Sequence, residues 1–138
     1  MSKKSNVKQF TDKLEKLNYS DMYEGDFFLT WEKSQDEIEA VFTVADALRH
    51  LRENNVSTKI FDSGLGISLF RDNSTRTRFS FASACNLLGL EVQDLDEGKS
   101  QIAHGETVRE TANMISFMAD AIGIRDDMYI GKGNAYMH

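Results

Sequence analysis

Residues 66–81 read Gly66-Ile67-Ser68-Leu69-Phe70-Arg71-Asp72-Asn73-Ser74-Thr75-Arg76-Thr77-Arg78-Phe79-Ser80-Phe81. The apolar run at 66–70 predicts a buried strand, and residues 75–88 predict a helix that ends before Gly89. The polar turn between them would follow the carboxyl end of the strand and begin the helix. Free backbone N–H groups at such a helix start attract anions, and the helix dipole adds to that attraction.

The chain continues with alternating strands and helices on either side of this segment. Apolar runs and helical spacing predict further elements, namely strands at 59–61, 90–95 and 121–124 and a helix at 106–119. Strands separated by helices form a parallel sheet through crossover connections. We therefore expect an α/β fold, a doubly wound three-layer α/β/α sandwich. Ligands bind beyond the carboxyl ends of such strands, which selects the segments 71–77, 96–104 and 125–131.

The amino-terminal part differs in pattern from the rest. We expect residues 1–33 to form an arm with a short amphipathic helix, and residues 34–138 to form the domain proper. Ser34 and Glu37 have the spacing of a capping box, which predicts the start of a longer helix. The apolar stripe expected on that helix consists of Ile38, Val41, Phe42, Ala45 and Leu48.

Composition narrows the class of protein. The chain has 138 residues, of which 41% are apolar and 28% charged, as expected for a globular domain. Its net charge of −6 argues against nucleic-acid binding, which needs a basic surface. We see no apolar run long enough for a membrane span and no secretory signal, so we expect a cytoplasmic protein. The single cysteine, Cys85, falls on an apolar helix face and is expected in the core.

The polar turn after residue 70 contains the residue types that hold a phosphate. Ser74, Thr75 and Thr77 supply hydroxyl donors, and Arg76 can offer a planar fork of N–H groups. Each of these residues alone is more often an ordinary helix cap or a solvated arginine. Together, directly after a strand, they favour a phosphate site. The pattern of a Walker loop is missing.

The motif Ser-Thr-Arg-Thr-Arg-x-Ser-Phe at 74–81 resembles the carbamoyl-phosphate motif of the transcarbamylases, the family of aspartate and ornithine carbamoyltransferases. The segment 98–107 resembles the ornithine-type loop that opens a helix, and 120–125 resembles the strand that ends in a phosphate-binding arginine. The resemblance covers roughly residues 34–131. The long arm and the sequence Phe-Arg-Asp-Asn at 70–73 also resemble those of the YgeW-type transcarbamylases.

The resemblance implies a role for particular residues. The implied ligands of carbamoyl phosphate are Ser74, Thr75, Arg76, Thr77, Gln101 and Arg125. Among these, Arg76 and Arg125 would be the catalytic residues. Lys99 and His104 would contact a neighbouring subunit in a homotrimer, although His104 could equally be an exposed loop histidine. Asp126 and Asp127 follow Arg125 and could pair with it or face water.

The implied activity is transfer of a carbamoyl group from carbamoyl phosphate to an amino or amide nitrogen of an unidentified second substrate. It would serve amino acid or purine metabolism and need neither a metal nor an organic cofactor. The sequence stops at His138, before the family's His-Pro-x-Gln segment and second domain. We therefore expect the truncated amino-terminal half of a two-domain fold, inactive alone. The alternatives are a non-catalytic paralogue, an assembly or anion-binding domain of the same fold, or another phosphate-binding α/β domain such as a receiver or kinase relative.

Overall fold

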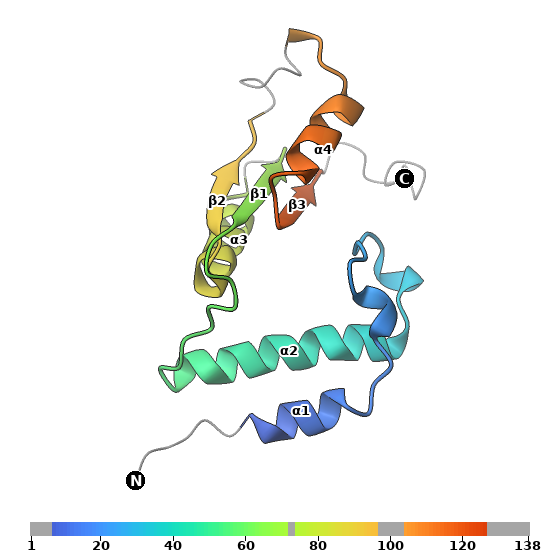
Figure 1. Cartoon of the computed structure of the whole chain (residues 1–138), viewed down its shortest axis with the longest axis vertical. Helices are drawn as coiled ribbons and strands as arrows, with labels where there is room; N and C mark the ends of the chain where they lie inside the picture. The colour runs from blue at the N-terminus through green and yellow to red at the C-terminus, as the bar shows by residue number, and fades with distance from the viewer. Residues whose placement is uncertain (1–6, 72–73, 97–103, 127–138) are drawn as a thin grey trace. The chain divides into compact units, whose positions relative to one another are not determined.

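The computed structural model describes residues 7–71, 74–96 and 104–126 (Figure 1). The chain forms two compact units, Met1–Thr58 and Lys59–His138. The first unit therefore includes the long helix that follows Ser34, while the domain boundary expected at residue 33 stays a prediction. Among the described residues, no helix combines the length and the apolar character that a membrane crossing requires.

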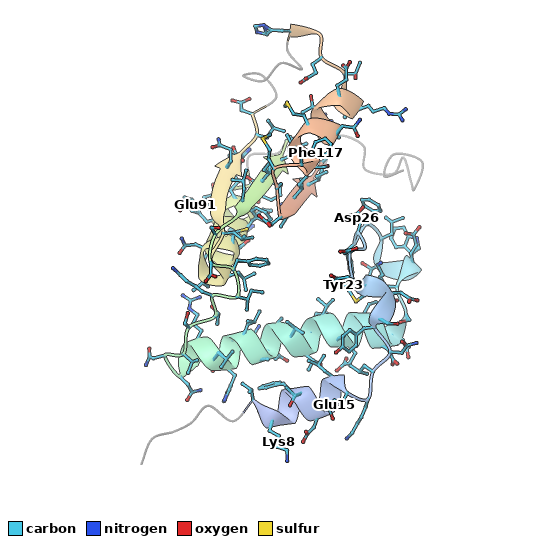
Figure 2. The ribbon with its side chains drawn as sticks, in the orientation of Figure 1. Lys8, Glu15, Tyr23, Asp26, Glu91 and Phe117 are labelled. Atoms are coloured by element: carbon cyan, nitrogen blue, oxygen red, sulfur yellow. The ribbon has the colours of Figure 1, made fainter. Side chains whose placement is uncertain are left out.

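The first unit is helical. Its elements are α1 (Lys8–Leu14), the 3₁₀ turns η1 (Ser20–Met22) and η2 (Thr30–Glu32), and α2 (Gln35–Glu53). Helix α1 packs against α2, and the rings of Phe10 and His50 lie 5.7 Å apart between their centroids. Lys8 lies on the side of α1 that faces away from α2 (Figure 2). This pairing partly covers Phe10 and Leu14 on one face of α1, as expected for an amphipathic helix.

The apolar stripe expected on α2 is wrong in its orientation. Ala40 and Thr43 are the buried residues of this helix, whereas Val41 and Phe42 are 42% and 61% exposed. Because successive residues are about 100° apart around the axis, the buried face lies on nearly the opposite side of the helix from this apolar stripe. A threonine is tolerated there because its hydroxyl donates to the Glu39 carbonyl oxygen at 2.7 Å, so no buried polar group is left unpaired.

The second unit contains a parallel sheet. Its elements are β1 (Leu65–Phe70), α3 (Thr75–Leu88), β2 (Glu91–Asp94), α4 (Val108–Ser116) and β3 (Ala121–Arg125), and the strand order is β2-β1-β3. Both strand pairs are parallel. Because the winding direction reverses after β2, right-handed crossovers place α3 and α4 on opposite faces, with α4 in front of the sheet in Figure 1. The doubly wound α/β prediction is confirmed.

One predicted strand does not form. Residues 59–61 were expected to extend the sheet, but the Ile60 and Phe61 N–H groups both donate to the Leu88 carbonyl oxygen at 3.0 Å. These donors therefore bind the end of α3 instead of a neighbouring strand. A short apolar run without a strand partner has no ladder to join, and its hydrogen bonds go to the helix end.

Helix α3 lies close to the sheet because two strand residues are glycines. A Cβ atom at Gly66 would lie 2.7 Å from the Cys85 sulfur, and one at Gly123 would lie 2.6 Å from the Phe81 ring. Cys85 is 6% exposed, which confirms the core position expected for it, and burial raises the pKa of its thiol. Phe81 also meets Phe70 edge to face, with ring centroids 5.6 Å apart.

Gly123→Ala should destabilise the protein because the new methyl group would overlap the Phe81 ring. We expect a loss of ~1–3 kcal/mol in the free energy of unfolding, measured by urea denaturation. The same substitution in a Phe81→Leu background should cost less, because the overlapping ring is gone. An equal cost in both backgrounds would contradict the proposed contact.

Two helices begin with complete capping boxes. The Ser34 hydroxyl accepts from the Glu37 N–H and the Glu37 carboxylate accepts from the Ser34 N–H, and Thr107 and Glu110 make the same pair of bonds at α4. The hydrogen bond from the Ser34 backbone, followed by that from its hydroxyl, lowers the pKa of Glu37. Thr107 lowers the pKa of Glu110 in the same way. The first box was predicted from the sequence, and the second begins α4 two residues later than expected.

The Glu37 carboxylate should stabilise the fold in a pH-dependent way. Because its pKa is lower in the folded than in the unfolded chain, the stabilisation is present above the ordinary value of 4.5 and is lost as pH falls through the folded pKa. Glu37→Gln should therefore reduce the unfolding free energy more at about pH 7 than at about pH 3. Glu91→Gln, at the start of β2 (Figure 2), is the control outside a helix cap. A pH-independent effect of Glu37→Gln would refute this role.

Candidate anion site at the carboxyl edge of the sheet

The strand order predicts a ligand-binding crevice between the carboxyl ends of β1 and β3. The connection from β1 leads to β2 on one side, and the connection from β2 returns across the sheet to β3 on the other side. Phe70 and Arg125, the last residues of β1 and β3, are partners in the ladder. The next N–H group, that of Arg71, still donates to the Arg125 carbonyl oxygen at 3.1 Å. Ligands of doubly wound sheets bind where neighbouring connections diverge in this manner.

The start of α3 opens beside this crevice. Ser74 is its N-cap residue, but the Ser74 side chain makes no capping hydrogen bond. Its hydroxyl lies 2.9 Å from the Thr77 hydroxyl instead. The first N–H groups of any α-helix have no carbonyl partner within the helix. In α2 and α4 a side chain accepts from one of them, whereas at α3 the N-cap side chain leaves them available to a ligand.

Arg125 reaches across from β3 to the first turn of α3. Its Nη1 atom donates to the Thr77 hydroxyl oxygen at 2.6 Å, in a part-buried position. The Thr77 hydroxyl thus contacts both Arg125 and Ser74. Ser74 and Thr77, from one sequence motif, therefore lie together with Arg125, from another. The two motifs are distant in the chain, since 48 positions separate Thr77 from Arg125. A guanidinium and two hydroxyls beside free N–H groups form a suitable environment for a phosphate dianion.

The other two residues of the motif are exposed. Thr75 and Arg76 form the first positions of α3, and both face solvent. Within the ranges 7–71, 74–96 and 104–126, the structure gives the Arg76 side chain no hydrogen bond or ion pair. Its charge is therefore not balanced by a described carboxylate, and it could turn toward an anion at the helix start.

Asp126 lies at the same edge but has a different partner from those expected. Its carboxylate does not face water. Instead it accepts from Arg71 Nη1 at 2.6 Å, and its side chain is only 3% exposed. Arg71 and Asp126 both follow strand ends that are neighbours in the sheet, which explains why they meet. Local sequence does not predict this pair, because the two residues are 55 positions apart in the chain.

Sequence reasoning also missed a second pair at this edge. Arg78 Nη1 donates to the Asp94 carboxylate at 2.5 Å, and Arg78 Nη2 donates to the Phe70 carbonyl oxygen at 2.6 Å. The signal could have been Asp94 itself, a carboxylate at the last position of β2 and so at the edge where ligands of such sheets bind. The different roles of Arg78 and Arg76 could not be predicted from the sequence, because both residues are arginines of the same motif.

The loop before α4 is only partly described. Lys99, Gln101 and Asp127 lie outside the described residues, so their predicted roles stay predictions. His104 is described and is exposed just ahead of α4. The structure therefore unites Ser74, Thr77 and Arg125 directly.

Thr77→Val should destabilise the fold by removing the oxygen that accepts from Arg125. Because that guanidinium is partly buried, we expect a loss of ~1–3 kcal/mol in urea unfolding experiments. Thr75→Val makes the same change at an exposed neighbouring position and should have little effect. Equal effects of the two substitutions would argue against the Arg125 contact.

Comparisons with known proteins match the part of the chain that contains the residues of this site. The family model described as "Aspartate/ornithine carbamoyltransferase, carbamoyl-P binding domain" matches residues 26–136. The protein YgeW of Escherichia coli strain K12, which carries the name of a carbamoyltransferase, is 75% identical over 118 residues, covering 86% of this chain and 30% of YgeW. The aspartate carbamoyltransferase catalytic subunit of Saccharophagus degradans is 38% identical over 90 residues, covering 64% of this chain and 27% of that protein.

Solved structures give the same result for the fold. The catalytic subunit of M. jannaschii aspartate transcarbamoylase superposes with a TM-score of 0.63 at 30% identity, covering 72% of this chain and 33% of the other. Trypanosoma cruzi aspartate transcarbamoylase in complex with carbamoyl phosphate superposes with a TM-score of 0.66 at 24% identity, covering 73% and 31%. The chain spans about 30% of the length of the curated relatives described above.

Proposed function

This chain belongs to the aspartate/ornithine carbamoyltransferase family, and we propose that it binds carbamoyl phosphate for carbamoyl transfer to an amino or amide nitrogen. The observation that carries the proposal is the Thr77 hydroxyl, which contacts both Arg125 and Ser74 where β1 and β3 end. This arrangement gathers hydroxyl, guanidinium and backbone N–H donors at one edge of the sheet. It is suited to the phosphate group of such a substrate.

The proposed ligands are the residues of the family motifs, namely Ser74, Thr75, Arg76, Thr77, Gln101 and Arg125. Arg76 and Arg125 would be the catalytic pair, because a guanidinium stabilises negative charge as it grows on the departing phosphate. Arg125 is held beside the helix start by Thr77, while the exposed Arg76 would order when the anion binds. Holding both substrates in one site would add an entropic contribution to the rate.

The reaction then follows from the electron balance. The lone pair of the acceptor nitrogen forms a bond to the carbamoyl carbon, and negative charge develops on the carbamoyl oxygen. The bond from that carbon to the phosphate oxygen breaks, and the phosphate leaves with the electron pair. The nitrogen loses a proton, which restores its neutral state. Positive donors near both oxygens lower the barrier of each step.

We propose further that the protein works in the cytoplasm as a homotrimer. The family resemblance supports this assembly, in which Lys99 and His104 would reach the site of a neighbouring subunit. The exposure of His104 is compatible with such a contact. The second substrate, an amine or amide, would be selected by residues other than those of the described anion site.

Arg76→Ala should weaken binding of carbamoyl phosphate by ~1.5–3 kcal/mol, the scale of a hydrogen bond to a charged group. Isothermal titration calorimetry measures this change directly. Arg49→Ala on α2 removes the same charge from an exposed position in the other unit and should leave affinity unchanged. Unchanged affinity in Arg76→Ala would remove this residue from the site.

A competition between two ligands tests the proposed substrate. The unaltered chain should bind carbamoyl phosphate more tightly than inorganic phosphate, because the carbamoyl group offers further hydrogen-bonding atoms. Equal affinities would indicate an anion-binding or assembly domain that uses the same fold. Absence of binding to either compound would refute the proposed function.

A further inference from the structure

We infer that Asp94 is a positioning residue for the anion site, acting through Arg78. The inference rests on the proposed function and deepens it. The residues concerned are Ser68, Asp94 and Arg78, which we term the Asp94 clamp. None of them belongs to the ligand set proposed above. The clamp joins β1, β2 and the first turn of α3 through one carboxylate.

The geometry of the clamp follows from the sheet register. Ser68 and Asp94 lie opposite each other in the β1–β2 ladder, and the Ser68 hydroxyl donates to Asp94 Oδ1 at 2.6 Å. Ser68 is only 3% exposed, so its buried hydroxyl needs this hydrogen-bond partner. The other carboxylate oxygen, Oδ2, accepts from Arg78 Nη1 at 2.5 Å. One aspartate thus uses both oxygens to connect a strand and a helix.

Arg78 completes the connection to β1. Its second terminal nitrogen, Nη2, donates to the Phe70 carbonyl oxygen at 2.6 Å. Phe70 is the last residue of β1, and Arg78 is the fourth residue of α3. The guanidinium therefore fixes the distance between the strand end and the helix start. A planar group held by two acceptors allows little rotation.

The first turn of α3 is consequently held from two sides. The Asp94 clamp ties it to β1 and β2, and the bond between Arg125 and Thr77 ties it to β3. The N–H groups proposed to bind phosphate lie in this turn, so their direction depends on both attachments. An error of a fraction of an ångström in such donors reduces binding strongly.

The charge of Arg78 is also accounted for. Asp94 neutralises this charge, and the Phe70 carbonyl oxygen accepts a further hydrogen bond from Arg78. Arg78 is therefore arranged to position the helix and not to bind phosphate. Arg76, two residues earlier, has no partner among the described residues and keeps its charge for the ligand. The two arginines of one motif would thus have different functions.

Removing Asp94 distinguishes positioning from direct binding. If the clamp positions the site, Asp94→Asn should weaken binding of inorganic phosphate about three- to tenfold, the range of coupling between residues in one network. Arg78→Gln should have a similar effect, and the double variant should be no weaker than either single variant. If Arg78 were itself a ligand, Asp94→Asn would free it and tighten binding, which would overturn the inference.

Stability measurements separate positioning from a merely structural role. The Asp94 and Arg78 side chains are 48% and 37% exposed, so their ion pair should add little to the stability of the fold. We expect Asp94→Asn to remain folded by circular dichroism, with the phosphate affinity of the folded protein reduced. Reduced stability with unchanged affinity would overturn the inference. Asp94→Glu keeps the charge and should restore most of the affinity.

A matched control lies in the other unit. Asp46 pairs with Arg49 on α2, and Asp46→Asn breaks that exposed pair without touching the sheet. Its phosphate affinity should equal that of the unaltered chain. The calorimetric titration also distinguishes a failure of the proposed function from a failure of the proposed role of Asp94. An unaltered chain that binds neither carbamoyl phosphate nor inorganic phosphate refutes the proposed function, whereas phosphate binding that is insensitive to Asp94→Asn refutes only the role of Asp94.

Discussion

The close approach of α3 to the sheet is the constraint on which the second unit depends. It is possible because Gly66 and Gly123 present no side chain to the helix, so Cys85 and Phe81 occupy the space that a Cβ atom would fill. A helix held further away would carry its first turn out of reach of the strand ends. Packing in the core and geometry at the edge are therefore consequences of the same two residues.

The four arginines at the carboxyl edge of the sheet have different kinds of partner. Arg71 and Arg78 each face an aspartate, whereas Arg125 donates to a threonine hydroxyl, and Arg76 is exposed at the helix start. Pairing two arginines reduces the repulsion that four neighbouring cations would otherwise create. The exposed Arg76 lies at the helix start, where a dianion would benefit most from the dipole.

Much of this arrangement was predictable from local sequence. Residues 75–88 form the helix expected, and the motif at its start identified Thr77, while the strand ending at 125 identified Arg125. The pairs Arg71–Asp126 and Arg78–Asp94 were not predicted, because each depends on strand order and register. Periodicity predicts that strands exist but does not specify which residues face each other. The same limit applies on α2, where spacing alone did not specify which side of the helix packs, and Val41 and Phe42 of the apolar stripe are exposed.

The contact between Arg78 and Asp94 also constrains how this family of sequences can diverge. A guanidinium that loses its carboxylate beside a cationic site would compete for incoming anions, and an aspartate without its arginine would repel them. Homologues should therefore inherit the two positions together, or replace both with an uncharged pair. Covariation of these two positions among homologues would indicate their contact, which cannot be recognised in a single sequence.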